Sequence, residues 1–138
     1  MVNKAVFFSL ICFSFVSCSK TNDKSGSSKE TGLPQRVKSS SQGIASWYSI
    51  RTNGGTRTAS GEKLRDSAST AAHKSLKMGT RVRVTNLRNS KSEIVRITDR
   101  GPYVKGRIID FTVGVAKRLG FYARGLAPVR VEVLEDQE

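Results

Sequence analysis

Three side chains capable of acid–base chemistry stand in short segments rich in turn-forming residues. Asp99 ends the run SEIVRITD and precedes Arg100-Gly101-Pro102, Glu62 follows Ser60-Gly61, and His73 is the only histidine of the sequence. A carboxyl group at a strand end, in front of a Gly-Pro turn, is held rigidly and faces an open surface. Carboxyl groups and imidazoles are the side chains that most often serve in general acid–base catalysis.

Each of these side chains also has a purely structural interpretation. Asp99 can cap a turn, Glu62 can be a solvated hairpin residue, and His73 can be a packing histidine with satisfied hydrogen bonds. Asp110 directly precedes a predicted helix, which favours backbone capping over catalysis. Side chains alternate along an extended segment, so Arg100 is expected to point away from Asp99 and to pair elsewhere or bind a ligand.

The residues for several other chemistries are missing from the part of the sequence that can fold. One histidine and no cysteine in residues 43–138 make a poor set of metal ligands, so we expect neither a metal nor a cofactor. No glycine-rich phosphate loop and no nucleophile–base pair is recognisable there either.

The elements that must position these residues are mostly strands. Apolar residues recur at every second position, or strand-forming residues cluster, in five segments: 43–50, 79–87, 92–99, 108–111 and 127–134. Residues 69–76 are rich in alanine and predict a helical turn or an irregular segment. Residues 112–125 predict a helix that Thr112 caps and Gly120 ends. Many short strands with one helix indicate a mainly β fold, a small closed barrel.

The first forty residues predict export rather than folding. Lys4 and the apolar run AVFFSLICFSFV are typical of a signal peptide, since the run is too short to span a bilayer. Phe15-Val16-Ser17-Cys18 resembles a bacterial lipobox, with Phe15 where leucine is usual, so Cys18 is the predicted lipidation site. The alternative, a buried helix, is disfavoured because polar sequence follows directly. Ser19 after the cysteine favours the outer membrane, with the domain facing the periplasm.

The predicted organisation therefore has four parts. Residues 1–17 are a signal peptide, 18–42 a lipidated cysteine and a flexible, disordered tether, 43–135 the folded domain, and 136–138 a tail.

The net charge of +13 predicts an anionic partner. For an exported protein this is the carboxylates of the cell wall or lipid head groups, and nucleic acid is not expected. A basic surface kept for solubility is the alternative.

Several motifs together resemble one known family. The segments GIASWYS, RTASGE, STAAHKSLKMGTRVRVTNL, VRITDRGPYVKGRIIDFTVGVAKRLG and APVRVEVL resemble the rare lipoprotein A (RlpA) family, in the family's order, from about Gly43 to Leu134. The resemblance implies a six-stranded double-psi β-barrel with one short helix. It also implies a lytic transglycosylase that cuts the β-1,4 bond between N-acetylmuramic acid and N-acetylglucosamine in peptidoglycan and leaves 1,6-anhydro ends.

Two departures from the family are visible in the sequence. Ser49 stands where the family usually has glycine after the Trp-Tyr pair, and no SPOR segment follows the barrel sequence. Septal targeting is therefore not expected from this sequence itself, although division or cell-wall proteins remain possible partners.

The resemblance also assigns roles to residues. It implies that Asp99 is the general acid/base, with Glu62 and His73 as the other polar site residues. Six side chains are expected to bind the glycan: Trp47, Tyr48, Arg100, Tyr103, Lys105 and Arg107. Trp47 is equally compatible with the core, and the cations with a solvated face. A non-catalytic, expansin-like glycan-binding lipoprotein remains the alternative to the enzyme.

Overall fold

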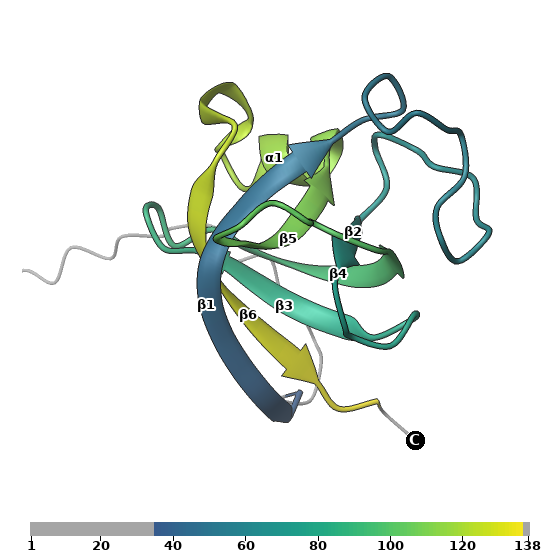
Figure 1. Ribbon diagram of the computed structural model, residues 1–138. Helices are drawn as coiled ribbons and strands as arrows, with labels where there is room; N and C mark the ends of the chain where they lie inside the picture. Colours follow the sequence, from purple (N-terminus) through teal and green to yellow (C-terminus); the bar gives the residue numbers. More distant parts are fainter. Residues whose placement is uncertain (1–34, 137–138) are drawn as a thin grey trace, which may run out of the picture. The chain divides into compact units, whose positions relative to one another are not determined.

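Six strands close into a barrel in the computed structural model, which describes residues 35–136 (Figure 1). The strands are β1 (Val37–Tyr48), β2 (Thr70–His73), β3 (Arg81–Asn86), β4 (Ser92–Asp99), β5 (Arg107–Thr112) and β6 (Ala127–Leu134). The predicted signal peptide, Cys18, the tether up to residue 34 and the last two residues lie outside the described part.

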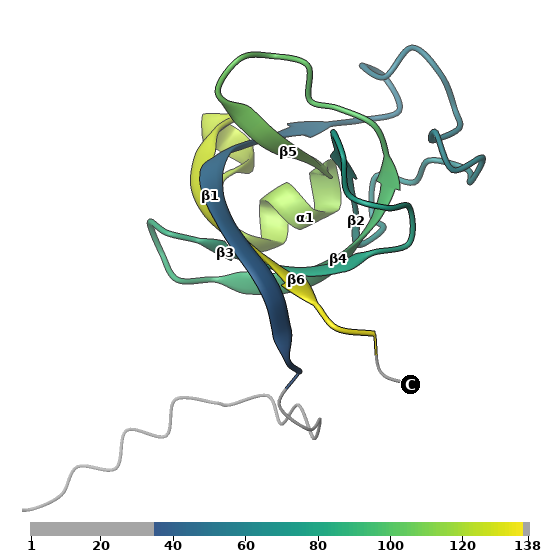
Figure 2. The ribbon, with the colours of Figure 1, turned by 60° about the horizontal axis from the view of Figure 1, so that its bottom comes forward.

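The strand order around the barrel is β1-β5-β2-β4-β3-β6. The pairs β1–β5 and β2–β4 are parallel, and the other four pairs are antiparallel. Figure 2 looks into the ring of strands and shows helix α1 (Val113–Arg118) within its outline. The predicted mainly β barrel with one short helix is confirmed.

The interior of the barrel is filled by side chains that point inward at every second position of the strands. Val82 and Val84 of β3 are fully buried, whereas the arginines between and beside them reach the outside. Buried Val115, Ala116 and Leu119 extend this core at α1. Period-two burial in β3 and β6 is what the Val-Arg-Val sequences predict.

Two predicted boundaries are wrong. Strand β1 begins at Val37, six residues before the expected start of the domain, because β6 supplies partners for these polar residues, such as Ser41 opposite Val131. Residues 70–73 form strand β2 rather than a helical turn or an irregular segment, because β4 and β5 flank this short segment on both sides. Inter-strand pairing overrides the weak local preference of alanine for helix.

The helix is shorter than the sequence predicts. It ends at Arg118, Gly120 turns the chain with a φ of 76°, and a separate 3-10 helix η1 spans Tyr122–Arg124. Thr112 occupies the N-cap position, but its hydroxyl donates to the Ala68 carbonyl instead of the helix. No helix in the described part is long and apolar enough to cross a membrane.

Candidate active site

A β-bulge determines where Asp99 points. The register of β2 against β4 pairs Ala71 with Ile97 and then Ala72 with Asp99, so Thr98 is an extra residue on β4. Ala71 and Ile97 are fully buried in the core, whereas Ala72, although only 4% exposed, is not part of the core cluster and by alternation points to the other face of the sheet. Because directly paired residues share a face, the bulge brings Asp99 to the outside of the barrel wall.

Asp110 stands on the same outer face, across β2 from Asp99. Ala72 pairs with Asp110 on one side and with Asp99 on the other. The two aspartates are therefore two strand separations apart, about 9–10 Å between their Cα atoms.

The surroundings of Asp110 raise its pKa. Burial is the main cause, and it is partly offset by a hydrogen bond from the Ser46 hydroxyl and by the charge of Arg107. Arg107 Nη1 also donates to Ser46 Oγ over 3.3 Å. The predicted capping role for Asp110 is wrong, because helix α1 has no side-chain cap and the carboxyl group faces β1 instead.

Tyr48 lies close enough to both Asp99 and Asp110 for their charges to affect the pKa of its phenol. Burial, followed by the charges of Asp99 and Asp110, raises the pKa of its phenol. Its hydroxyl is buried and has no hydrogen-bond partner within the described residues. A buried donor without a partner is costly, which is typical of a group that a ligand completes.

The loop before β2 fixes Asp99. Asp99 Oδ1 accepts hydrogen bonds from the backbone N–H groups of Ala59 and Arg100, each at 2.9 Å. The same loop is bonded to β4 through Ser60 N and the Thr98 carbonyl at 3.0 Å. Asp99 Oδ2 receives no hydrogen bond from residues 35–136, so one oxygen of this largely buried side chain, 9% exposed, is anchored and the other has no partner there.

The turn after Asp99 requires its glycine. Gly101 has a φ of 120°, a backbone conformation that residues other than glycine rarely adopt. It lets the chain leave the barrel wall immediately after the aspartate.

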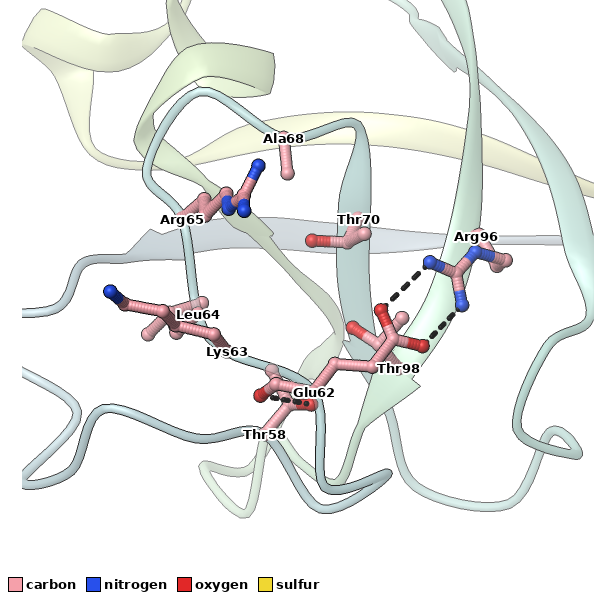
Figure 3. Close-up of a pocket in the computed structure, with 9 residues that line it drawn as sticks. All are labelled: Thr58, Glu62, Lys63, Leu64, Arg65, Ala68, Thr70, Arg96 and Thr98. Atoms are coloured by element: carbon pink, nitrogen blue, oxygen red, sulfur yellow. Dashed lines mark hydrogen bonds and ion pairs between the residues drawn. The ribbon is translucent and has the colours of Figure 1, made fainter.

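Glu62 pairs with an arginine rather than with Asp99. Its two oxygens accept hydrogen bonds from Arg96 Nη1 at 2.6 Å and Nη2 at 2.8 Å (Figure 3). This bond to Arg96 is the main reason that the pKa of Glu62 is lowered. The pair borders a pocket of about 360 Å³ between the 58–68 segment and the outer face of β2 and β4.

His73 organises a turn at the end of β2. Its Nδ1 accepts hydrogen bonds from the backbone N–H groups of Ser75 and Leu76 at 3.2 and 3.1 Å. Burial, with the charges of Arg100 and Lys74, lowers the pKa of the imidazole. With Nδ1 accepting, the neutral ring carries its proton on Nε2. His73 pairs with core-facing Ile109, so it leaves β2 on the opposite side from Ala72.

Arg100 supports the same turn, as expected from its alternation with Asp99. Its Nη1 donates to the carbonyls of His73 and Leu76 at 3.0 and 2.7 Å. The turn and the anchored aspartate are therefore tied together by one side chain.

The other predicted glycan-binding residues separate into two groups. Trp47 packs against the core, stacks on Tyr122 with 4.7 Å between ring centroids, and donates to the Tyr122 carbonyl. Tyr103 is 80% exposed and Lys105 is also exposed, both on the loop between β4 and β5. The structure thus brings Tyr48 and Arg107 to the aspartates and leaves Tyr103 free to contact a ligand.

Sequence reasoning favoured capping over catalysis for Asp110 and so did not place this carboxyl group near Asp99. The signal was present in RIIDFT, because a carboxylate between the apolar residues of a strand has no simple structural purpose. Ser46, whose hydroxyl donates to Asp110, was also not among the predicted site residues. No group of three or more metal-ligating side chains gathers anywhere in residues 35–136.

Comparisons with known proteins give the family. Residues 40–131 match the family model described as lytic transglycolase, a double-psi β-barrel domain. A probable endolytic peptidoglycan transglycosylase RlpA from Nostoc sp. is 53% identical, over 80% of this chain and 31% of its own length. The endolytic peptidoglycan transglycosylase RlpA of Campylobacter jejuni is 47% identical, over 71% of this chain and 35% of its own length. The chain thus spans about a third of the length of these relatives.

Solved structures support the fold. The Streptomyces papain inhibitor superimposes with a TM-score of 0.58 at 16% identity, covering 75% of this chain and all of the inhibitor. A Clavibacter michiganensis expansin superimposes with a TM-score of 0.57 at 19% identity, covering 72% of this chain and 52% of the expansin. The barrel is thus a double-psi β-barrel, and with the matched segment covering most of its described residues, the chain belongs to the RlpA-type lytic transglycolase family.

Proposed function

We propose that this chain is a peptidoglycan lytic transglycosylase. It cleaves the β-1,4 bond between N-acetylmuramic acid and N-acetylglucosamine and leaves 1,6-anhydro-muramic ends. Family membership supports the reaction class, and relatives that carry this domain are named endolytic peptidoglycan transglycosylases. The observation that carries the proposal is an aspartate with one anchored and one free oxygen on the outer face, beside a second carboxyl group.

Asp99 is the general acid and then the general base. Its proton passes to the glycosidic oxygen as the bond from that oxygen to the anomeric carbon breaks. The resulting carboxylate then takes the proton of the muramic 6-hydroxyl as that oxygen bonds to the anomeric carbon. The carboxyl group returns to its starting state and no water is consumed, so a single acid–base residue is sufficient.

Asp110 stabilises the positive charge that develops on the sugar ring. Burial disfavours its ionised form in the free protein, as its raised pKa indicates. An approaching positive charge therefore stabilises this carboxylate more than it would stabilise an exposed one, which is the differential effect that catalysis needs. The Tyr48 hydroxyl donates to the glycan in this proposal, which its lack of a hydrogen-bond partner within residues 35–136 supports.

Glu62 and His73 act less directly in this proposal. His73 and Arg100 hold the turn that follows β2, and so position the segment next to Asp99. Glu62 reaches the glycan only after it leaves Arg96, because both of its oxygens are engaged there.

The protein works in the cell envelope under this proposal, where its substrate is. Anchoring through a lipidated Cys18, with the domain facing the periplasm, would keep it beside the wall. Mass spectrometry of the mature chain, released by a detergent, tests the anchor: the expected mass includes acyl chains on Cys18, and an unmodified N-terminus contradicts it.

The activity is tested by incubating purified sacculi with the full chain and with its Asp99→Asn variant. We expect anhydro-muropeptides from the wild type and at least about 10²-fold less from the variant, the usual contribution of a general acid–base group. Asp136→Asn, an exposed aspartate near the end of the barrel sequence, is the control and should retain full activity. If the wild type and the Asp99→Asn variant both bind sacculi and neither releases fragments, the protein is a glycan-binding module instead.

A further inference from the structure

The residues that line the pocket beside β4 are suited to binding an anion, because basic side chains outnumber acidic ones among them. Three cations, Lys63, Arg65 and Arg96, border it, and Glu62 is its only acidic residue. The ion pairs found in residues 35–136 use Arg96 but neither Lys63 nor Arg65. The pocket therefore keeps an excess of positive charge that one anionic group can balance.

A buried hydroxyl group that belongs to a residue lining this pocket has no hydrogen-bond partner within residues 35–136. Thr98 borders the pocket and is 1% exposed, and its Oγ1 makes no hydrogen bond within the described residues (Figure 3). A hydroxyl desolvated to this degree is normally satisfied. An acceptor oxygen from a ligand would satisfy it.

The guanidinium of Arg96 is already arranged for a carboxylate. Glu62 occupies both of its outer nitrogens in the planar, bidentate geometry that arginine offers to carboxylates. The two side chains are 44% and 45% exposed, so the pair is weak and its exchange costs little. A carboxylate from a ligand can take the place of Glu62 and set that side chain free.

The pocket is adjacent to the reacting centre. Thr98 is the covalent neighbour of Asp99, and Thr58, which also borders the pocket, precedes the Ala59 amide that binds Asp99 Oδ1. A group bound in the pocket therefore lies next to the segment that anchors Asp99.

We propose that this pocket is a carboxylate subsite of the glycan groove, and that the bound carboxylate replaces Glu62 on Arg96. The inference rests on the proposed function for the identity of the glycan, since muramic acid carries its lactyl group on the ring that is cut. The carboxylate comes from that lactyl group or from a stem peptide, and the two sources share the same chemistry.

Monosaccharide probes separate this proposal from cleavage, because they bind without being cut. The full chain, solubilised in a non-ionic detergent, is titrated with N-acetylmuramic acid and with N-acetylglucosamine, which lacks the lactyl group. Backbone amide NMR shifts at Leu64, Ala68 and Thr98 report on the pocket. We expect shifts at these amides with N-acetylmuramic acid and at least about tenfold weaker binding of N-acetylglucosamine, as expected for a lost charged hydrogen bond.

Two variants should move the affinity in opposite directions. Arg96→Gln weakens binding of N-acetylmuramic acid by about tenfold or more, since the charged fork is lost. Glu62→Gln tightens it, since the competing carboxylate is removed, and a merely structural Glu62 would not have this effect. Arg130→Gln, an exposed arginine on β6, is the charge-matched control and should bind as the wild type does.

The source of the carboxylate is resolved by a third probe, the dipeptide L-alanyl-D-glutamate. Tighter binding of the dipeptide than of N-acetylmuramic acid identifies the stem peptide, and the reverse identifies the lactyl group. Equal binding of the two sugars, no shifts at the pocket amides, or equal effects of Arg96→Gln and Arg130→Gln would overturn the proposal. Any of these results leaves the cleavage assay untouched, so the two proposals fail separately.

Discussion

At the scale of single residues, the site depends on two aspartates in different environments. Asp99 is held by two backbone N–H groups through one oxygen, whereas Asp110 is half-buried against Ser46. The sequence pointed to Asp99 because of its turn. For Asp110 it favoured capping over catalysis, because the position of Asp110 near Asp99 depends on β2 lying between β4 and β5, which local sequence does not specify.

Asp110→Asn should make the protein more stable at neutral pH and less active. The pKa of Asp110 is raised in the folded state, so its contribution to stability is present below the unfolded pKa of about 3.9 and is lost as the pH rises through the folded pKa. Asparagine does not ionise, so the Asp110→Asn variant does not lose stability in this way as the pH rises. Thermal unfolding at pH 4 and pH 7 should show a larger gain in Tm at pH 7, with anhydro-muropeptide release reduced about tenfold or more. A gain that is independent of pH would contradict this account of Asp110.

Tyr48→Phe should separate ligand binding from folding. The hydroxyl has no partner within the described residues, so its removal should change the free energy of unfolding by less than about 1 kcal/mol, or even stabilise. Glycan release should nevertheless fall, if the hydroxyl donates to the substrate. Denaturant unfolding and the sacculus assay on the same preparation measure the two effects. Large destabilisation with unchanged release per folded molecule would show that the hydroxyl has a structural role.

At the scale of elements, tight backbone contacts set the position of the loop that carries Glu62 and Ala59. Gly114 of α1 donates to the Asp66 carbonyl at 2.7 Å, and Ile50 N donates to Asp66 Oδ1 at 2.9 Å. Figure 1 shows this long 49–69 segment projecting from the barrel between β1 and β2. The contact with α1 is therefore one of the points at which the segment is fixed.

Gly114→Ala should destabilise the fold because the helix approaches this segment too closely for a side chain. A Cβ atom at Gly114 would lie 2.8 Å from the Asp66 carbonyl oxygen. Overpacking of this kind costs roughly 1–3 kcal/mol. Gly55→Ala is the control, since a Cβ atom there meets nothing within 4 Å. Chemical denaturation compares the two variants, and an equal effect on both would mean that the contact with Asp66 is not a constraint.

Element prediction from the sequence succeeded where a strand alternates and failed where it does not. The segment 127–134 matches β6 and the segment 79–87 contains β3, and the valines of both strands alternate with polar residues. The β2 strand contains two successive alanines and only four residues, so its state is set by its neighbours. The bulge at Thr98 leaves no local sequence signal either, although it decides the side on which Asp99 lies.

At the scale of the whole molecule, charge should govern how the protein finds its substrate. The chain has 24 Lys and Arg against 11 Asp and Glu. Binding to an anionic wall through many exposed cations is screened by salt, because the Debye length falls from about 10 Å at 0.1 M to about 3 Å at 1 M.

Co-sedimentation of the Asp99→Asn variant with sacculi should therefore fall steeply between about 0.1 M and 1 M NaCl. Sacculi whose carboxyl groups have been amidated should bind weakly even at low salt. Binding that is insensitive to salt and to amidation would show that apolar stacking, through residues such as Tyr103, dominates instead of charge. The composition alone predicted an anionic partner, whereas the positions of the cations around the barrel required the closed strand order.

The measurement that tests the central claim most directly is the mass of the released glycan ends after digestion in oxygen-18 water. An intramolecular attack by the muramic 6-hydroxyl incorporates no solvent oxygen, so the wild type should yield unlabelled ends that are lighter by one water than a reducing end. Asp99→Asn should yield almost none. Reducing ends labelled with oxygen-18 would mean that water is the nucleophile, and anhydro ends released equally by the Asp99→Asn variant would remove Asp99 from the chemistry.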